Sequence, residues 1–376
     1  MKYVKRFSIL FSIYFVVCGT SINAADAPAQ NKPEGQPELK VVNLAVYPAP
    51  ITRPAMKYHL LPRIAAQTPG NAALLYDTIF IRIAEEDGIR DGQLKDLKDE
   101  KEKEKFSTNA DKLSKWMNTP LAELPKDDIR KILDNVQPWC MEYAEMASRR
   151  IECDWELPIH EINNLFEIRL PELHRARSLA RILAMNARLS LAEGKPEDAL
   201  KTLQIGFALS RQIGNEKETL VNYLVGNAIA NMMIDQLLDL TQVENAPNLY
   251  WSLSNVPHPF LDFHNSVELE HFAMPRHFPA LQEARNGQHS PEQWQKLWEE
   301  TIDKLNSLKE EFSKLNIPEL ISAKQSGKID AKQALEQFYP VARDYLIELG
   351  RPEKEIQSMA PAHVMLLYGA EILDEV

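Results

Sequence analysis

The chain has 376 residues, of which 44% are hydrophobic and 8% aromatic, and its formal net charge is −11 at pH 7. This much apolar material excludes a wholly disordered chain, and the acidic balance argues against a protein that binds a nucleic-acid backbone. Glycine is scarce, at 13 residues, which argues against Gly-rich phosphate-binding loops and against sheets with frequent tight turns.

Residues 1–24 have the pattern of a signal peptide. Lys2, Lys5 and Arg6 form a basic start, and residues 7–17 are an apolar run about half as long as the ~20 residues that a membrane span needs. Small residues lead to a cleavage position after Ala24. An uncleaved anchor helix is the alternative. We expect export to the periplasm, the cell envelope or the medium, with no stable membrane span once the signal is cleaved.

Two segments without helical pattern follow the signal. Residues 25–40 are polar and rich in proline, and they cannot bury enough apolar surface to fold, so a disordered tether is expected. Residues 41–67 are more apolar but interrupted by prolines, which predicts an extended arm that lies across a helical body. Residues 68–376 are then expected to form an α-helical hairpin domain.

Proline, glycine and capping residues mark the ends of the expected helices. Pro-Glu pairs precede several helical patterns, Ser290 with Gln293 and Asp330 with Gln333 form capping patterns, and Gly194 follows a helix end. No segment alternates β-branched and polar residues, so a sheet of any size is not expected. The predicted helices lie near residues 70–87, 92–106, 126–136, 138–151, 171–193, 196–213, 217–242, 247–254, 260–273, 291–315, 330–349 and 361–374.

The segment LAEGKPEDALKTLQ, Leu191–Gln204, resembles the middle of a tetratricopeptide hairpin. One helix ends before Gly194, the next begins at Pro196, and the small residues Ala187 and Ala199 lie where two helices would cross closely. The 34-residue period does not recur on either side. The expected fold is therefore all-α, an irregular stack of antiparallel helical hairpins that is similar to an α-solenoid, with an extended N-terminal arm.

Several stretches carry a resemblance to known sequences, among them ECDWELP at 152–158 and LARILAMNARLSLAEGKPEDALKTLQIGFALSRQIG at 179–214. The others are residues 54–76, 246–262 and 345–368. Together they are similar to uncharacterised exported helical-repeat proteins of planctomycete-type bacteria. The resemblance covers about half of the chain and implies export, an all-α fold and a largely single structural body. It implies no activity, cofactor or catalytic residue.

Four histidines gather in residues 258–277 and suggest a metal site. On a helix, His264, Glu268 and His271 share one face, and Glu268 and His271 have the spacing used in di-metal carboxylate bundles. Those bundles need a second Glu-x-x-His pair, and no other histidine here follows a glutamate by three residues. A solvent-facing polar stripe is therefore the favoured interpretation, and a zinc or iron site is the weaker alternative. No catalytic residue and no cofactor is expected.

Cys140 and Cys153 are the two cysteines that follow the signal. The residues between them are predicted to be helical, which would hold the two Cα atoms too far apart for a disulfide. Cys153 with Asp154 and His160 also suggests a thiol nucleophile beside a base, but spacing alone does not create that geometry. We expect instead that Cys153 packs at a helix end, with Asp154 as its cap.

Asparagines in apolar helices suggest a peptide groove. Asn186, Asn222, Asn227 and Asn231 could line such a groove, bond neighbouring loops or face water. The stretch NLYWSL, residues 248–253, could be an aromatic recognition patch, although core packing is the favoured interpretation.

These patterns together predict an exported, non-enzymatic binding or scaffold module that mediates protein–protein interaction in the cell envelope. Its partner would be a protein or peptide and not a nucleic acid. Two alternatives remain open at this point: a metal-dependent enzyme with a site near residues 258–277, and a passive structural protein of the envelope.

Overall fold

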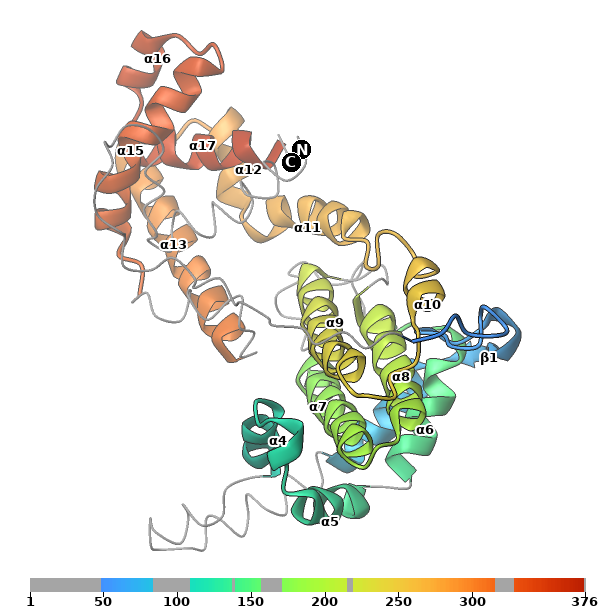
Figure 1. Cartoon of the computed structure of the whole chain (residues 1–376). Coiled ribbons are helices and arrows are strands. Elements are labelled where there is room, and N and C mark those ends of the chain that lie inside the picture. Colours follow the sequence, from blue (N-terminus) through green and yellow to red (C-terminus); the bar gives the residue numbers. More distant parts are fainter. Residues whose placement is uncertain are drawn as a thin grey trace, which may run out of the picture. The chain divides into compact units, whose positions relative to one another are not determined.

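The computed structural model describes residues 49–83, 109–136, 139–156, 171–214, 219–314 and 328–374, and most of them are helical (Figure 1). They fall into two compact units. We call the described residues up to 269 the N-terminal unit and those from 270 onward the C-terminal unit. The boundary lies within helix α11 (His264–His277).

Three consecutive helices form the centre of the N-terminal unit. They are α7 (Pro171–Ala192), α8 (Pro196–Gly214) and α9 (Leu220–Thr241), and each packs against the other two (Figure 1). The turn from α7 to α8 follows from its residues. Gly194 takes a φ of 73°, which only glycine adopts without strain, and Lys195 donates its backbone N–H to Ser190 O at 2.8 Å. Pro196 then begins α8, where no N–H is needed.

Glycines let α8 and α9 approach closely. A Cβ atom placed on Gly226 would lie 2.7 Å from Gly214 Cα and 2.8 Å from Ser210 O, so only glycine fits at position 226. The Ser210 hydroxyl donates a hydrogen bond to Gly226 O at 2.8 Å across the same contact. The contact between α8 and α9 is therefore made by backbone atoms as well as by side chains.

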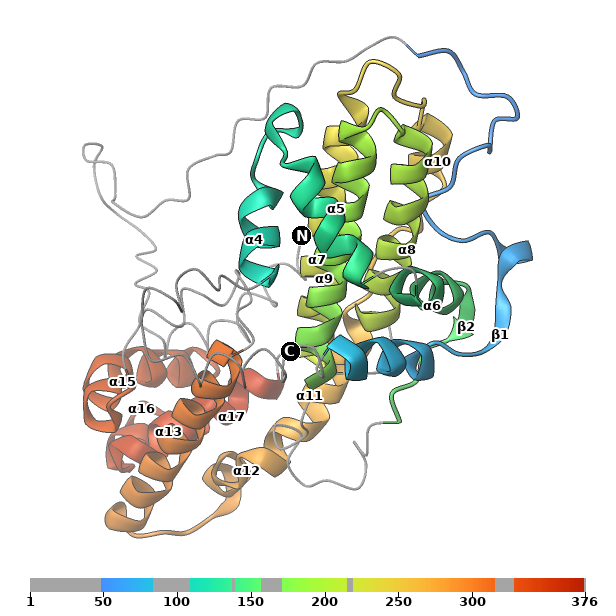
Figure 2. The ribbon, with the colours of Figure 1, turned by 90° about the horizontal axis from the view of Figure 1, so that it is seen from below.

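Smaller elements surround this centre. Figure 2 shows α4 and α5 beside α7, and α6 beside α8, which agrees with the helix contacts. The buried Arg188 on α7 donates hydrogen bonds to Gln236 Oε1 at 3.0 Å, to Asp239 and to Thr119 O, and so ties α9 and the segment after α4 to α7. These surrounding elements are a helix at residues 73–83, α4 (Asn109–Met117), η2 (Leu121–Glu123), α5 (Lys126–Val136), α6 (Trp139–Ser148) and α10 (Tyr250–Ser254).

Two short strands, β1 (Thr68–Asn71) and β2 (Arg150–Glu152), pair in parallel. Both overlap the ends of predicted helices, at 70–87 and 138–151, so those two boundaries were wrong. Asn71 explains the first boundary, because its Oδ1 accepts from the backbone N–H of Ala73 at 3.0 Å and of Asp154 at 2.9 Å. This side chain caps the helix at residues 73–83 and joins the two strands.

The C-terminal unit is a second helical cluster. Helix α17 packs against α12, α13 and α15 around a core that includes Trp294, Trp298 and Leu346. Both predicted caps of this unit are confirmed. The backbone N–H of Gln293 donates to Ser290 Oγ at 3.3 Å, and that of Gln333 donates to Asp330 Oδ1 at 2.8 Å. The helices are α12 (Pro279–Asn286), α13 (Pro291–Lys314), α15 (Ala331–Glu348), α16 (Glu353–Ser358) and α17 (Pro361–Asp374).

The expectation of a mostly helical chain with packed helix pairs is confirmed. Helices α4, α12 and α16 were not predicted, and the predicted helix at 92–106 lies outside the described residues, as do the signal and the tether. The predicted single domain over 68–376 contrasts with the two compact units. Within the described part of the chain, no helix is long and apolar enough to cross a bilayer.

Candidate functional site

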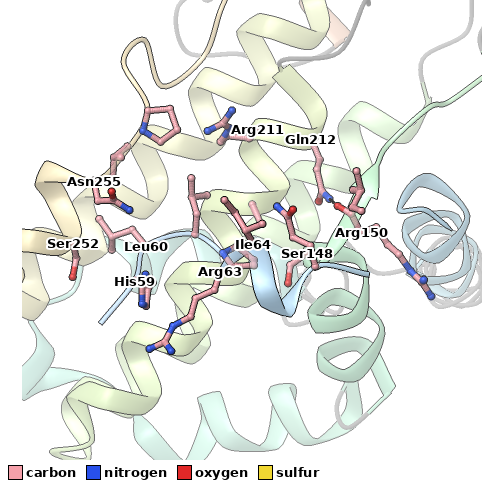
Figure 3. Close-up of a pocket in the computed structure, with 17 residues that line it drawn as sticks. His59, Leu60, Arg63, Ile64, Ser148, Arg150, Arg211, Gln212, Ser252 and Asn255 are labelled. Carbon is pink, nitrogen blue, oxygen red and sulfur yellow. Dashed lines mark hydrogen bonds between the residues drawn. The ribbon is translucent and has the colours of Figure 1, made fainter. Parts of the chain in front are cut away.

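A pocket of about 620 Å³ opens in the N-terminal unit (Figure 3). Its wall comes from four places in the sequence: the segment before β1, the end of α6 with the start of β2, the C-terminal half of α8, and the end of α10. Ligand sites commonly have volumes of ~300–1,000 Å³, so the pocket has the size of a binding site. We therefore treat it as the candidate functional site.

The segment before β1, residues 49–67, is held in place as one wall of the pocket. Gln204 of α8 donates its Nε2 hydrogens to His59 O at 3.1 Å and to Leu61 O at 3.0 Å. Ser252 of α10 donates to Tyr58 O at 2.8 Å. These bonds satisfy backbone carbonyls that no regular secondary structure satisfies, and they seat the buried Leu60 against the helices.

The same segment is anchored again at the start of α8. Glu197 accepts hydrogen bonds from Lys57 Nζ at 2.8 Å and from Tyr58 OH at 2.7 Å. These two bonds, led by the one from Lys57, lower the pKa of the Glu197 carboxyl. The carboxylate therefore stays ionised and keeps the segment attached over the whole neutral range.

Gln212 holds the opposite wall. Its Nε2 donates to Ala147 O at 3.0 Å and to Arg150 O at 3.3 Å, and its Oε1 accepts from Tyr76 OH at 2.6 Å. Burial raises the pKa of the Tyr76 phenol well above its usual range, so the phenol remains a donor. One side chain of α8 thus fixes the end of α6, the start of β2 and the helix at residues 73–83.

The charge of the wall is the pocket's most distinctive property. None of the 17 described residues that line it is Asp or Glu, whereas the positively charged side chains of Arg63, Arg150 and Arg211 all contribute. Arg63 donates to the carbonyl oxygens of Met56 at 3.3 Å and Lys57 at 3.5 Å, and Arg150 donates to Pro69 O. Neither Arg63 nor Arg150 forms an ion pair within the described residues.

Arg211 is the arginine that remains open to a ligand. Its side chain is half-buried, and desolvation lowers the pKa of the guanidinium. Within the described ranges it forms neither a hydrogen bond nor an ion pair, and its guanidinium carbon lies 5.8 Å from the Phe260 ring centre. Partial burial of a charge without a counter-charge is unfavourable, so an anion at this position would stabilise the guanidinium.

His59 lines the pocket as a neutral ring. Burial, with a smaller contribution from the charge of Arg63, lowers the pKa of the imidazole, and a hydrogen bond to the Met56 backbone opposes this shift. Its Nε2 atom is buried and has no hydrogen-bond partner among the described residues. The positive charge of the pocket at neutral pH therefore comes from the arginines.

The rim of the pocket is apolar. Ile64 is 86% exposed and Ile151 is 60% exposed, and both line the pocket. These exposed isoleucines leave apolar surface in a cationic wall, which a bound ligand would remove from water.

The chain was compared with family models, with curated proteins and with solved structures, and none of the three comparisons finds a match. The resemblance to exported helical-repeat proteins therefore stays a prediction.

The residues considered for a metal site lie on α11 and are exposed. His264 shares a hydrogen bond with Asp262, with 2.6 Å between Nδ1 and Oδ1, and Glu268 and His271 face solvent. The described part of the chain contains no group of three or more His, Cys, Asp or Glu side chains that could hold a metal ion.

Cys140 and Cys153 are both buried. The Asp154 carboxylate accepts the backbone N–H of Glu156 at 2.8 Å in the segment that follows β2, and within the described residues it caps no helix. Trp155 stacks on Phe80 with 5.9 Å between ring centres. His160 lies outside the described residues, so no arrangement of a thiol with a base is described.

The four asparagines lie in different surroundings, because Asn227 is half-buried and Asn231 is exposed. Asn222 is buried and accepts from Thr219 Oγ1 at 2.8 Å, while Asn186 donates to Thr202 Oγ1 of α8 at 3.2 Å. Asn186 thus joins α7 to α8, whereas the bond of Asn222 lies at the start of α9.

The stretch NLYWSL is split between core and surface. Leu249 and Ser252 are buried, whereas Tyr250 is 65% and Trp251 is 45% exposed. Core packing, the favoured interpretation of this stretch, was therefore wrong for its aromatic residues. They lie on α10, which also contributes to the pocket wall.

The pocket itself was missed by the sequence analysis. The position of Arg211 was one sequence feature that could have indicated the pocket, because this charged residue lies in α8 between the buried residues Ser210 and Ile213. Nothing in the local pattern of Arg63 or Arg150 indicated that both would reach the same wall, since residues more than 60 positions apart meet there only through tertiary contacts.

Proposed function

We propose that this protein is an exported helical binding module whose pocket accepts an anionic segment of a protein partner in the cell envelope. One observation carries the proposal: the described residues of the pocket wall include three arginines and no Asp or Glu, in a chain whose formal net charge is −11 at pH 7. A wall of this kind reverses the sign of the local field and attracts an anion that the rest of the surface would repel.

The polar groups of the wall suit binding better than catalysis. The Ser148 hydroxyl donates to Glu145 O at 2.7 Å and the Ser252 hydroxyl to Tyr58 O at 2.8 Å, so both hydroxyls already bind backbone carbonyls. The Nε2 atom of His59 is buried, out of reach of a bound substrate. The wall thus offers a positive charge and apolar surface, which hold and orient a ligand, and its described residues include no activated nucleophile.

The finer architecture is part of the same proposal. We infer that α7, α8 and α9 belong to an irregular stack of helical hairpins, similar to tetratricopeptide units, with residues 49–67 as the arm that completes the binding face. The short turn at Gly194, the close contact of α8 with α9, and the hydrogen bonds that hold the arm support this inference. Export rests on the signal pattern of residues 1–24.

Calorimetric titration with two synthetic peptides tests the proposal. One peptide alternates leucine and aspartate and has a free carboxyl end, and the other alternates leucine and lysine and has an amidated end. We expect the acidic peptide to bind at least about tenfold more tightly, and to bind more weakly as NaCl is raised from about 50 to about 500 mM. Equal binding of the two peptides, or no binding of either, would refute an anion-binding pocket.

Two variants locate the binding in the pocket. Arg211→Gln removes one positive charge from α8 inside the pocket, and Lys201→Gln removes one from the same helix at a side chain that is 76% exposed and outside the pocket wall. The first variant should lose the preference for the acidic peptide and the second should keep it. The opposite pattern would assign the preference to the general surface.

A further inference from the structure

Arg211 is the arginine of the pocket wall with the most N–H groups left for an anion. In Figure 3 the side chains of Arg63, Arg150 and Arg211 leave the wall in three different directions. The guanidinium groups of Arg63 and Arg150 each use one nitrogen to donate to backbone carbonyls, whereas Arg211 forms no hydrogen bond within the described residues and keeps all of its N–H groups for an anion. One guanidinium pairs well with a carboxylate, whereas a doubly charged phosphate is usually held by several cationic groups.

A bound ligand must also cover apolar surface. Ile64 and Ile151 are exposed at the rim, and Val256 and Pro257 line the wall on the side of α10. Small inorganic anions and sugar acids would leave this surface in water. An anion that carries an apolar side chain would bury it, at a gain of roughly 25 cal/mol per Å².

The wall includes the side-chain amide of Asn255, which can form hydrogen bonds with a peptide group. Asn255 lines the pocket, its side chain is exposed, and within the described residues it forms no side-chain hydrogen bond. A side-chain amide has both a donor and an acceptor, which matches the N–H and C=O of a peptide bond. The pocket therefore combines a contact for a carboxylate, a contact for a peptide amide, and apolar surface.

We propose that the occupant is the C-terminal end of a partner protein with an apolar last residue, its terminal carboxylate on Arg211 and its last peptide group on Asn255. This inference rests on the proposed function and narrows it to one ligand class. At the end of a chain, one residue supplies the carboxylate, the amide and the apolar side chain together. An internal Asp or Glu would require the chain both to enter and to leave a pocket of about 620 Å³.

Three acetylated pentapeptides, titrated calorimetrically into the full-length protein, separate the sources of the carboxylate. The first ends in two leucines with a free carboxyl group, the second is the same peptide with an amidated end, and the third is amidated but carries an internal aspartate. We expect the free acid to bind at least about tenfold more tightly than its amide, because a hydrogen-bonded charge pair is lost on amidation. The aspartate peptide should bind no better than the plain amide.

Each other outcome has a definite meaning. If the aspartate peptide binds as tightly as the free acid, the C-terminal assignment is wrong and the proposal of an anion-binding pocket stands. If neither the free acid nor the aspartate peptide binds more tightly than the plain amide, both proposals fail. Displacement of the free acid by an equal concentration of inorganic phosphate would identify a phosphate site and overturn the C-terminal assignment.

Arg211→Gln should reduce the difference in affinity between the free acid and the amide to less than about twofold, and Lys201→Gln should leave that difference unchanged. The comparison of the three peptides on the unaltered protein stands even if Arg211→Gln does not fold.

Discussion

The contact between α8 and α9 makes the free energy of unfolding sensitive to a single methyl group at Gly226. In Gly226→Ala the new Cβ would lie 2.7 Å from Gly214 Cα, 2.8 Å from Ser210 O and 2.9 Å from Gly214 N, whereas ordinary van der Waals contact begins near 3.4 Å. All three are backbone atoms, so none can rotate away, and the helices must separate by about 0.7 Å.

The magnitude follows from two opposing effects. Overpacking of this kind costs about 1–3 kcal/mol, and more where the backbone must move. Alanine regains about 1 kcal/mol of helix propensity relative to glycine. Separation of the helices also lengthens the hydrogen bond from the Ser210 hydroxyl to Gly226 O, which is 2.8 Å. We expect a net loss of about 2 kcal/mol, which corresponds to a Tm lower by roughly 4–8 °C in a unit of this size.

Urea unfolding followed by circular dichroism measures this loss. Gly369→Ala in α17 is the matched control, because it makes the same change inside a helix but its Cβ would meet only the tip of the Leu281 side chain, at 3.1 Å. That variant should differ from the parent protein by less than about 1 kcal/mol. If Gly226→Ala proved as stable as Gly369→Ala, the close packing of α8 on α9 described above would be wrong.

Two further substitutions probe buried charge. Arg188→Met should lower the free energy of unfolding by about 2–4 kcal/mol, because it removes the partner of Asp239 and Gln236, and urea unfolding should show a loss well above that of the exposed control Lys131→Met. Asp77→Asn tests a raised pKa. Burial, opposed in part by Arg175, raises the pKa of the Asp77 carboxyl, so its charged form opposes folding at pH 7. The variant should be more stable than the parent at pH 7, with the difference disappearing as the pH falls below about 4, and a difference independent of pH would contradict this.

Local signals in the sequence were sufficient to define the limits of the long helices α7, α8, α13 and α15. Gly194 and Pro196 mark the turn between α7 and α8, and Ser290 with Gln293 marks the start of α13, because caps and turns depend on backbone groups only a few residues apart. The limits of α6 and of the helix at 73–83 were less accurate. They depend on the pairing of β1 with β2 through Asn71, which joins residues about 80 positions apart.

The candidate site depended on tertiary structure almost completely. Arg63, Arg150 and Arg211 carry no shared motif, and they line one wall only because Gln204 holds the arm and Gln212 holds the end of α6 against α8. Local patterns of apolar, capping and turn residues predicted a helical chain, and composition determined that it would be acidic overall. The location of a cationic pocket was decided by side-chain hydrogen bonds between distant segments, since the sign of a local field depends on which charges the fold brings together.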